Sequence, residues 1–160
     1  MSTKYFLHRI QKEDGAFSKG IEVHDTLNAA VLSFWGRMKY GYDNPTKPGM
    51  TFVSCKVTDS NGNVVGKYDM TWLKEGAEEE NVFFMHHIRK DGETFSKDID
   101  VCESREEALR LLAAAMEYGY ENSKYPNVTF DSCMITDLMS GGMVLFEDTW
   151  IKAEAEPDEA

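Results

Sequence analysis

Polar and apolar residues alternate along the beginning of the chain in the way that a β-strand requires. Phe6, His8 and Ile10 fall on one side of this stretch, and the intervening residues fall on the other. Because apolar side chains occur on both sides, we expect both faces of the strand to be partly covered. The turn Glu13-Asp14-Gly15 separates it from a second alternating run over residues 17–23. The two runs predict a β-hairpin.

A helical period replaces the alternation after the hairpin. Apolar residues from Ala30 to Met38 recur at the spacing of one helical face. Thr26 stands where a helix N-cap is expected, and Gly41 is a typical residue at which a helix ends. The pattern therefore predicts one helix with a single apolar stripe, which needs a sheet to cover.

Two more strands are predicted after the helix. The first covers residues 51–58, and the second ends at Trp72. Asn61-Gly62 between them favours a type I′ turn, because both central residues tolerate positive φ. The order of elements is ββαββ, which is typical of an antiparallel sheet with one covering helix.

The whole pattern then occurs a second time. Residues 5–74 recur at residues 83–152 with a constant offset of 78, so that Phe17-Ser18-Lys19 returns as Phe95-Ser96-Lys97. We predict an α+β fold of two tandem ββαββ units related by a pseudo-twofold axis, each a four-stranded antiparallel sheet covered by one helix. The units span residues 1–74 and 82–152. An acidic linker (75–81) joins them and an acidic disordered tail (153–160) follows. Whether the two sheets join edge to edge stays open.

Charge distinguishes the two units. The chain of 160 residues has a net charge of -11, but residues 1–74 carry ten Lys or Arg against seven Asp or Glu. Residues 81–152 carry seven against thirteen. A solvated surface is one explanation, and an anionic contact face for a basic partner is the other. The candidate contact residues of the second unit are Asp98, Asp100, Glu103, Glu106, Glu107 and Glu117.

No motif announces catalysis, a metal or a cofactor. His8 and His86 are the only histidines that recur, and no recurring acid accompanies them in the same segment, so we predict a structural role. The histidines lack metal-binding spacing, and no two cysteines form a CxxC pair. The odd number of cysteines suits a reducing compartment, with the thiols buried. We predict a protein that is not an enzyme, with no catalytic residue, metal or cofactor.

The same features limit the partners. The acidic net charge disfavours direct binding of nucleic acid. No apolar run has the length of a membrane span, and no signal peptide is recognisable, so we expect a cytoplasmic protein of a bacterial host cell. The oligomeric state is open between monomer and homodimer.

The packing and turn signals resemble those of small uncharacterised proteins carried by prophages and mobile elements of Firmicutes. The resemblance rests on Phe-Ser-Lys, the helix end at Tyr-Gly-Tyr, Ser-Cys-x-Val/Ile-Thr-Asp and the closing Thr-Trp, and it covers each half separately. It implies a phage or mobile-element origin and no known active site. With the acidic face, it leads us to expect a non-catalytic inhibitor of a host defence nuclease. Such an anti-CRISPR-like protein would occupy a basic surface that normally binds nucleic acid.

Two alternatives come from other functional classes. The first is a small-ligand or nucleotide-binding protein with its site at the interface between the repeats. There the twofold-related pairs His8 with His86 and Lys19 with Lys97 would converge. The second is a hydrolase with a carboxylate or histidine pair in a cleft.

Overall fold

A computed structural model describes residues 3–42, 49–76, 81–120, 126–138 and 142–152. Most of the predicted linker and the whole predicted tail (153–160) lie outside these residues. Among the described helices, none is long and apolar enough to cross a membrane.

Each unit consists of two strands, a helix and two more strands, as predicted. The first unit contains β1 (Tyr5–Glu13), β2 (Ala16–His24), α1 (Leu27–Tyr42), β3 (Met50–Asp59) and β4 (Val64–Leu73). The second unit contains β5 (Phe83–Asp91), β6 (Thr94–Cys102), α2 (Arg105–Tyr120), β7 (Val128–Asp137) and β8 (Val144–Ile151). All pairings are antiparallel, in the orders β2-β1-β3-β4 and β6-β5-β7-β8. The α+β fold of two ββαββ units is confirmed.

The helices begin at the predicted caps. The Thr26 hydroxyl accepts a hydrogen bond from the Ala29 N–H at 3.1 Å. In the second unit, the Ser104 hydroxyl accepts from the Glu107 N–H at 3.1 Å, and the Glu107 carboxylate accepts from the Glu103 N–H at 3.2 Å. These bonds satisfy backbone donors that have no partner within the helix.

The turn between β3 and β4 differs from the prediction. Gly62 has a φ of 83°, but Asn61 does not have positive φ, so the predicted type I′ turn is wrong. Instead, the Asp59 carboxylate accepts from the N–H groups of Asn61 and Asn63, at 2.9 and 3.1 Å. The aspartate side chain thus holds a longer turn in which one glycine is sufficient. Positive φ at two successive residues occurs instead at Asp14 and Gly15, between β1 and β2.

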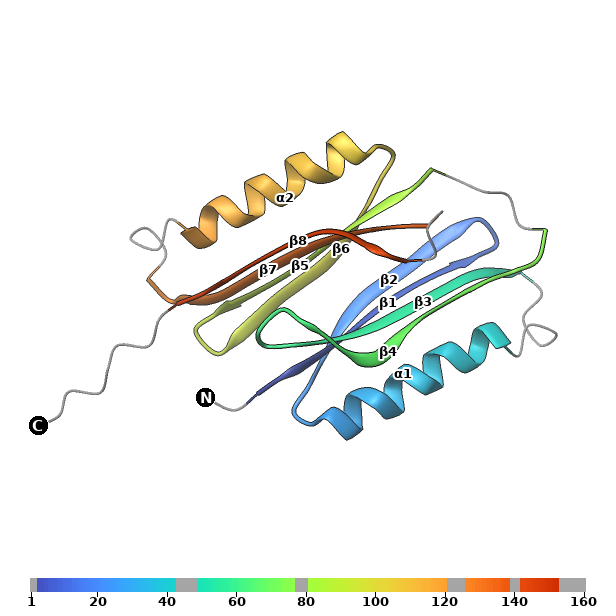
Figure 1. Cartoon of the computed structure of the whole chain (residues 1–160), viewed down its shortest axis with the longest axis horizontal. Coiled ribbons are helices and arrows are strands. Elements are labelled where there is room, and N and C mark those ends of the chain that lie inside the picture. Colours follow the sequence, from blue (N-terminus) through green and yellow to red (C-terminus); the bar gives the residue numbers. More distant parts are fainter. Residues whose placement is uncertain (1–2, 43–48, 77–80, 121–125, 139–141, 153–160) are drawn as a thin grey trace, which may run out of the picture.

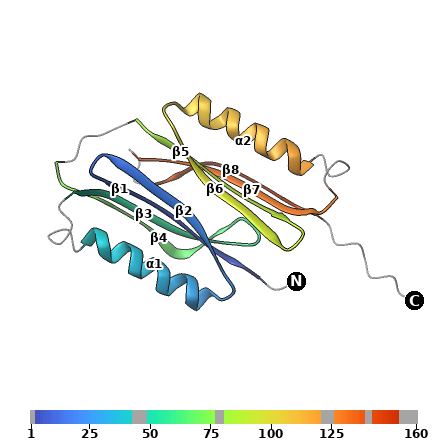
Figure 2. The ribbon, with the colours of Figure 1, turned by 180° about the vertical axis from the view of Figure 1, so that it is seen from behind.

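The two sheets stack face to face between the two helices (Figure 1). The outer face of the first sheet packs on α1 through residues such as Phe34 and Met38, and α2 covers the second sheet in the same way. The inner faces meet in a shared core that includes Phe6 and Ile10 from β1 and Phe84 and Ile88 from β5. Seen from behind, the helices again form the two outer layers (Figure 2). This arrangement explains why the strands are apolar on both sides.

Reciprocal contacts connect the two units. The Phe6 ring stacks on Phe130 with centroids 5.8 Å apart, and Phe84 stacks on Phe52 at 6.1 Å. The turn glycine of each unit also lies against the last strand of the other. A Cβ on Gly62 would stand 2.1 Å from the Thr149 hydroxyl oxygen, so only glycine fits there. The interface is therefore closely packed both in its centre and at the turns.

Candidate functional site

The six candidate carboxylates lie on two neighbouring elements of the second unit. Asp98 and Asp100 belong to β6, and Glu103 follows directly after that strand. The other three are on α2. Asp100 is half-buried and the other five are exposed.

These carboxylates form two groups. Burial, followed by the charges of Glu107 and Asp100, raises the pKa of the Cys102 thiol to about 11. Because Cys102 belongs to β6 and Glu107 to α2, this interaction places Glu107 at the edge between the helix and the strand. Glu106 and Glu117 are eleven residues apart, which is close to three helical turns, so they share a ridge of α2. That ridge is turned by about 100° from Glu107. The predicted acidic face thus consists of an α2–β6 edge and an adjacent helix ridge.

The acids of the second unit lack the ion pairs that their equivalents form in the first. Glu22, which corresponds to Asp100, binds Arg37 at 3.1 Å. Asp25, which corresponds to Glu103, binds Lys4 at 2.5 Å. Among the residues that the structure describes, no ion pair involves any of the six candidate carboxylates. Their charge is therefore available to an external cation.

The cations on α2 leave that charge in place. The Arg105 guanidinium lies over the Phe146 ring, 4.8 Å from its centroid. The Arg110 Nε donates to the backbone carbonyl of Glu106 at 3.5 Å instead of to the side chain. The edge and the ridge are consequently anionic surfaces.

The two recurring histidines meet in the core between the sheets. The Nδ1 atoms of His8 and His86 are 3.0 Å apart. Each Nε2 atom forms a hydrogen bond with a threonine hydroxyl, Thr58 at 2.8 Å and Thr136 at 2.9 Å. The histidines are only 4% and 3% exposed. Because all four ring nitrogens have partners and the rings touch, this part of the interface has no room for a ligand.

Both imidazoles are held in the neutral form. Burial, and to a lesser degree the charge of Lys56, lowers the pKa of His8 from 6.5 to about 3. Burial also lowers the pKa of His86 well below its usual value. Two neutral rings can share the Nδ1–Nδ1 contact only if one carries its proton on Nδ1 and the other on Nε2. One proton thus breaks the pseudo-twofold symmetry, and the pair forms a structural bridge, as the sequence indicated.

A second polar cluster lies between the second sheet and α2. Asp131 is fully buried; one of its carboxylate oxygens accepts from His87 Nε2 at 2.7 Å, and the other from Arg89 at 3.0 Å. Arg89 also donates to the Ala115 carbonyl at 2.9 Å. This cluster is not among the sites predicted from the sequence. The available signal was the aspartate itself, which occupies the position of the buried Val53.

Three residues of this cluster could bind a metal ion, since His87, Asp131 and Cys133 place ligand atoms within 4.8 Å of one another. Burial, together with the charge of Asp131, raises the pKa of the Cys133 thiol. A metal would have to remove that thiol proton and break the hydrogen bond between His87 and Asp131. The arrangement instead favours an ion-pair network that connects β5, β7 and α2.

Two large apolar side chains are exposed on the helix of the first unit, and neither recurs in the second unit. Leu32 is 75% exposed and Trp35 is 48% exposed on α1, and their equivalents on α2 are Arg110 and Ala113. The helix α1, which carries these apolar side chains, and α2, which carries the acidic ridge, form opposite outer layers of the molecule (Figure 1).

No family model matches this chain, and neither the curated proteins nor the solved structures contain a significant match to it.

Proposed function

We propose that the protein is a non-catalytic binding protein that uses the acidic side of its second unit to occupy a basic surface of a protein partner. The observation that carries the proposal is the difference between the units. Glu22 and Asp25 are ion-paired, whereas Asp100 and Glu103 at the equivalent positions have no ion-pair partner among the described residues. A surface that has lost internal counter-charges gains long-range attraction for a basic protein.

The spacing of the charges supports a partner that otherwise binds nucleic acid. Carboxylates occur along β6, around the start of α2 and again at Glu117, so they follow an extended path instead of a single point. Basic surfaces that bind nucleic acid also present cations along a path. Inhibition by occupying such a surface, as in an anti-CRISPR-like protein, is the specific form of this proposal.

The buried polar groups are consistent with a non-catalytic role in this proposal. His8 and His86 are buried and bind each other, and Asp131 is saturated by His87 and Arg89. A general base must reach a substrate proton, which these groups do not do from their positions.

The test compares capture of partners from a bacterial lysate by the wild-type protein and by Glu106→Lys/Glu107→Gln/Glu117→Lys. Glutamine is chosen at position 107 because it can keep the hydrogen bond to the Glu103 N–H. We expect the variant to lose capture by tenfold or more, and the wild type to lose it when the salt is raised from about 0.1 M to about 0.5 M. The captured protein should bind labelled DNA or RNA, and the wild-type chain should displace that nucleic acid.

A matched control changes acids elsewhere: Glu75→Lys/Glu93→Gln/Glu147→Lys alters the net charge equally at three exposed positions outside the α2–β6 side. This control should capture the partner normally. Equal capture by both variants, or capture that is insensitive to salt, contradicts the proposal. Melting temperatures of the variants establish that the fold is retained.

A further inference from the structure

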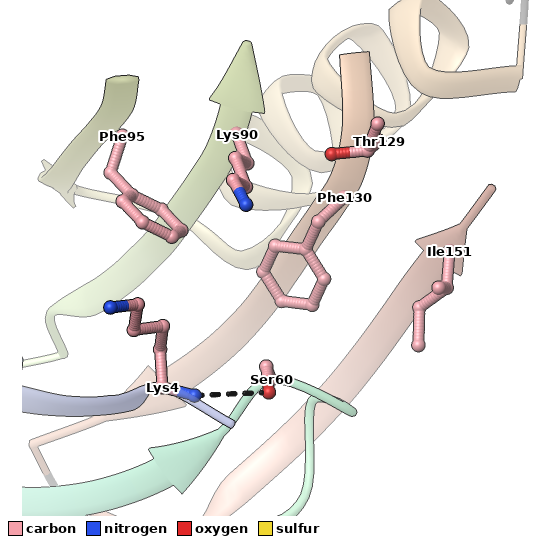
Figure 3. A pocket seen from close by; sticks show the side chains of 7 residues that line it. All are labelled: Lys4, Ser60, Lys90, Phe95, Thr129, Phe130 and Ile151. Carbon is pink, nitrogen blue, oxygen red and sulfur yellow. Dashed lines mark hydrogen bonds between the residues drawn. The ribbon is translucent and has the colours of Figure 1, made fainter. Parts of the chain in front are cut away.

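One end of the interface between the units contains a pocket. A pocket of about 30 Å³ lies beside the rings of Phe95 and Phe130, and Ile151 forms another part of its wall. The first unit contributes Lys4 and Ser60 to the opposite side (Figure 3). The pocket is therefore built from both units, away from the histidine pair.

Comparison of the two units shows which side chains fill the equivalent of this pocket at the other end of the interface. The offset of 78 makes Val82 the equivalent of Lys4, and Leu138 the equivalent of Ser60. Leu138 is 3% exposed and belongs to the core between the sheets, and Val82 packs against that core. Two branched aliphatic side chains thus fill the space at one end of the interface, and a lysine and a serine replace them at the other.

The backbone is supported at both ends. The Leu138 N–H donates to the Val82 carbonyl at 3.1 Å, and at the open end the Ser60 hydroxyl accepts from the Lys4 N–H at 3.3 Å. The aromatic part of the wall is the same at both ends, since Phe95 and Phe130 correspond to Phe17 and Phe52. The two ends of the interface therefore have the same aromatic rings, and the open end lacks the two aliphatic side chains.

Polar groups surround the apolar space. The Lys90 ammonium lies 5.7 Å from the centroid of the Phe95 ring, and in Figure 3 the Lys90 side chain is directed toward the pocket. Lys4 adds a second ammonium group nearby, and Thr129 and Ser60 add hydroxyls. The Lys4 ammonium forms an ion pair with Asp25, so Lys90 is the principal cation for a ligand. Cations and hydroxyls around an apolar pocket favour an apolar group that carries an anion.

We propose that this pocket binds a small branched aliphatic carboxylate. The aliphatic part takes the place that Leu138 and Val82 fill at the other end, and the carboxylate binds Lys90 with the hydroxyls of Ser60 and Thr129. The pocket volume limits the inserted part to a few carbon atoms. This site is separate from the acidic surface, so its failure would leave the proposed function intact.

The test uses 4-methylpentanoate as the probe, titrated into the full chain and followed by NMR. We expect saturable shifts at the Ile151 methyl groups and at the Phe95 and Phe130 rings, with a dissociation constant of about 1 mM. The corresponding alcohol, 4-methylpentan-1-ol, should bind at least about fivefold more weakly, and Lys90→Gln should weaken carboxylate binding by a similar factor.

Ser60→Leu supplies the decisive variant, because it restores the residue found at the filled end. It should abolish the shifts and raise the melting temperature by about 3 °C through filling of the pocket. Asn61→Leu is the matched control, since it adds the same side chain at the next, exposed position and should leave binding unchanged. Absence of saturable shifts at about 20 mM probe, or equal binding by Ser60→Leu, overturns the proposal.

Discussion

The buried histidine pair predicts a loss of stability in mild acid. Unfolding exposes His8, whose imidazole then takes up a proton below pH 6.5, whereas the folded protein resists that proton until about pH 3. The stabilisation is therefore complete above pH 6.5 and declines as the pH falls from 6.5 toward 3. At about pH 4.5 the difference is about two pH units, or about 3 kcal/mol for His8 alone. His86, whose pKa is lowered as well, adds to this loss.

Urea unfolding followed by tryptophan fluorescence at about pH 7 and about pH 4.5 measures the effect. The control is the double variant His8→Leu/His86→Leu, which replaces both titrating groups with apolar side chains. We expect the free energy of unfolding of the wild type to fall between the two pH values by at least about 3 kcal/mol more than that of the double variant. Equal decreases in the two proteins would show that the pair is not protonated on unfolding, and would refute the reasoning.

Two further predictions concern the second cluster and the interface turn. Asp131→Asn leaves Arg89 without its buried counter-charge and should lower the free energy of unfolding by about 3 kcal/mol or more, measured in urea; the exposed Asp98→Asn should change it by under about 0.5 kcal/mol, and similar values for both would contradict the network. Gly62→Ala brings a Cβ to 2.1 Å from the Thr149 hydroxyl oxygen, whereas Gly76, with nearly the same φ of 82°, has open space. Gly62→Ala should therefore lower the free energy of unfolding by about 1 kcal/mol more than Gly76→Ala, and equal losses would argue against the close contact between the units.

Several parts of the site were predictable from particular residues. The recurrence of His8 as His86 without an acidic neighbour indicated a structural role, which the contact between the two rings bears out. Convergence of the two histidines was expected only in the alternative with a ligand site between the repeats, because a residue meets its own equivalent only if it lies near the symmetry axis. The place of that axis depends on how the sheets stack. In the same way, Asp131 was visible as an aspartate in place of Val53, but its partners on a neighbouring strand were not.

The sequence by itself determined the local structure and its repetition. Alternation, helical spacing, caps and breakers act between residues that are close along the chain, so two ββαββ units follow from them without knowledge of the rest. Among the described turns, the one at Asn61-Gly62 was wrongly predicted because the Asp59 side chain supplied hydrogen bonds that the dipeptide pattern does not include.

Only the tertiary structure decided what covers the second face of each sheet. An apolar strand face predicts that the face is buried. It does not predict whether a helix, a sheet edge or another sheet lies against it, since the hydrophobic effect has no direction. Stacking the sheets face to face placed His8 against His86 and Gly62 against Thr149. The first unit has Ser60 at the position where the second has Leu138. Because the sheets are stacked, this difference leaves a pocket that is lined by residues of both units.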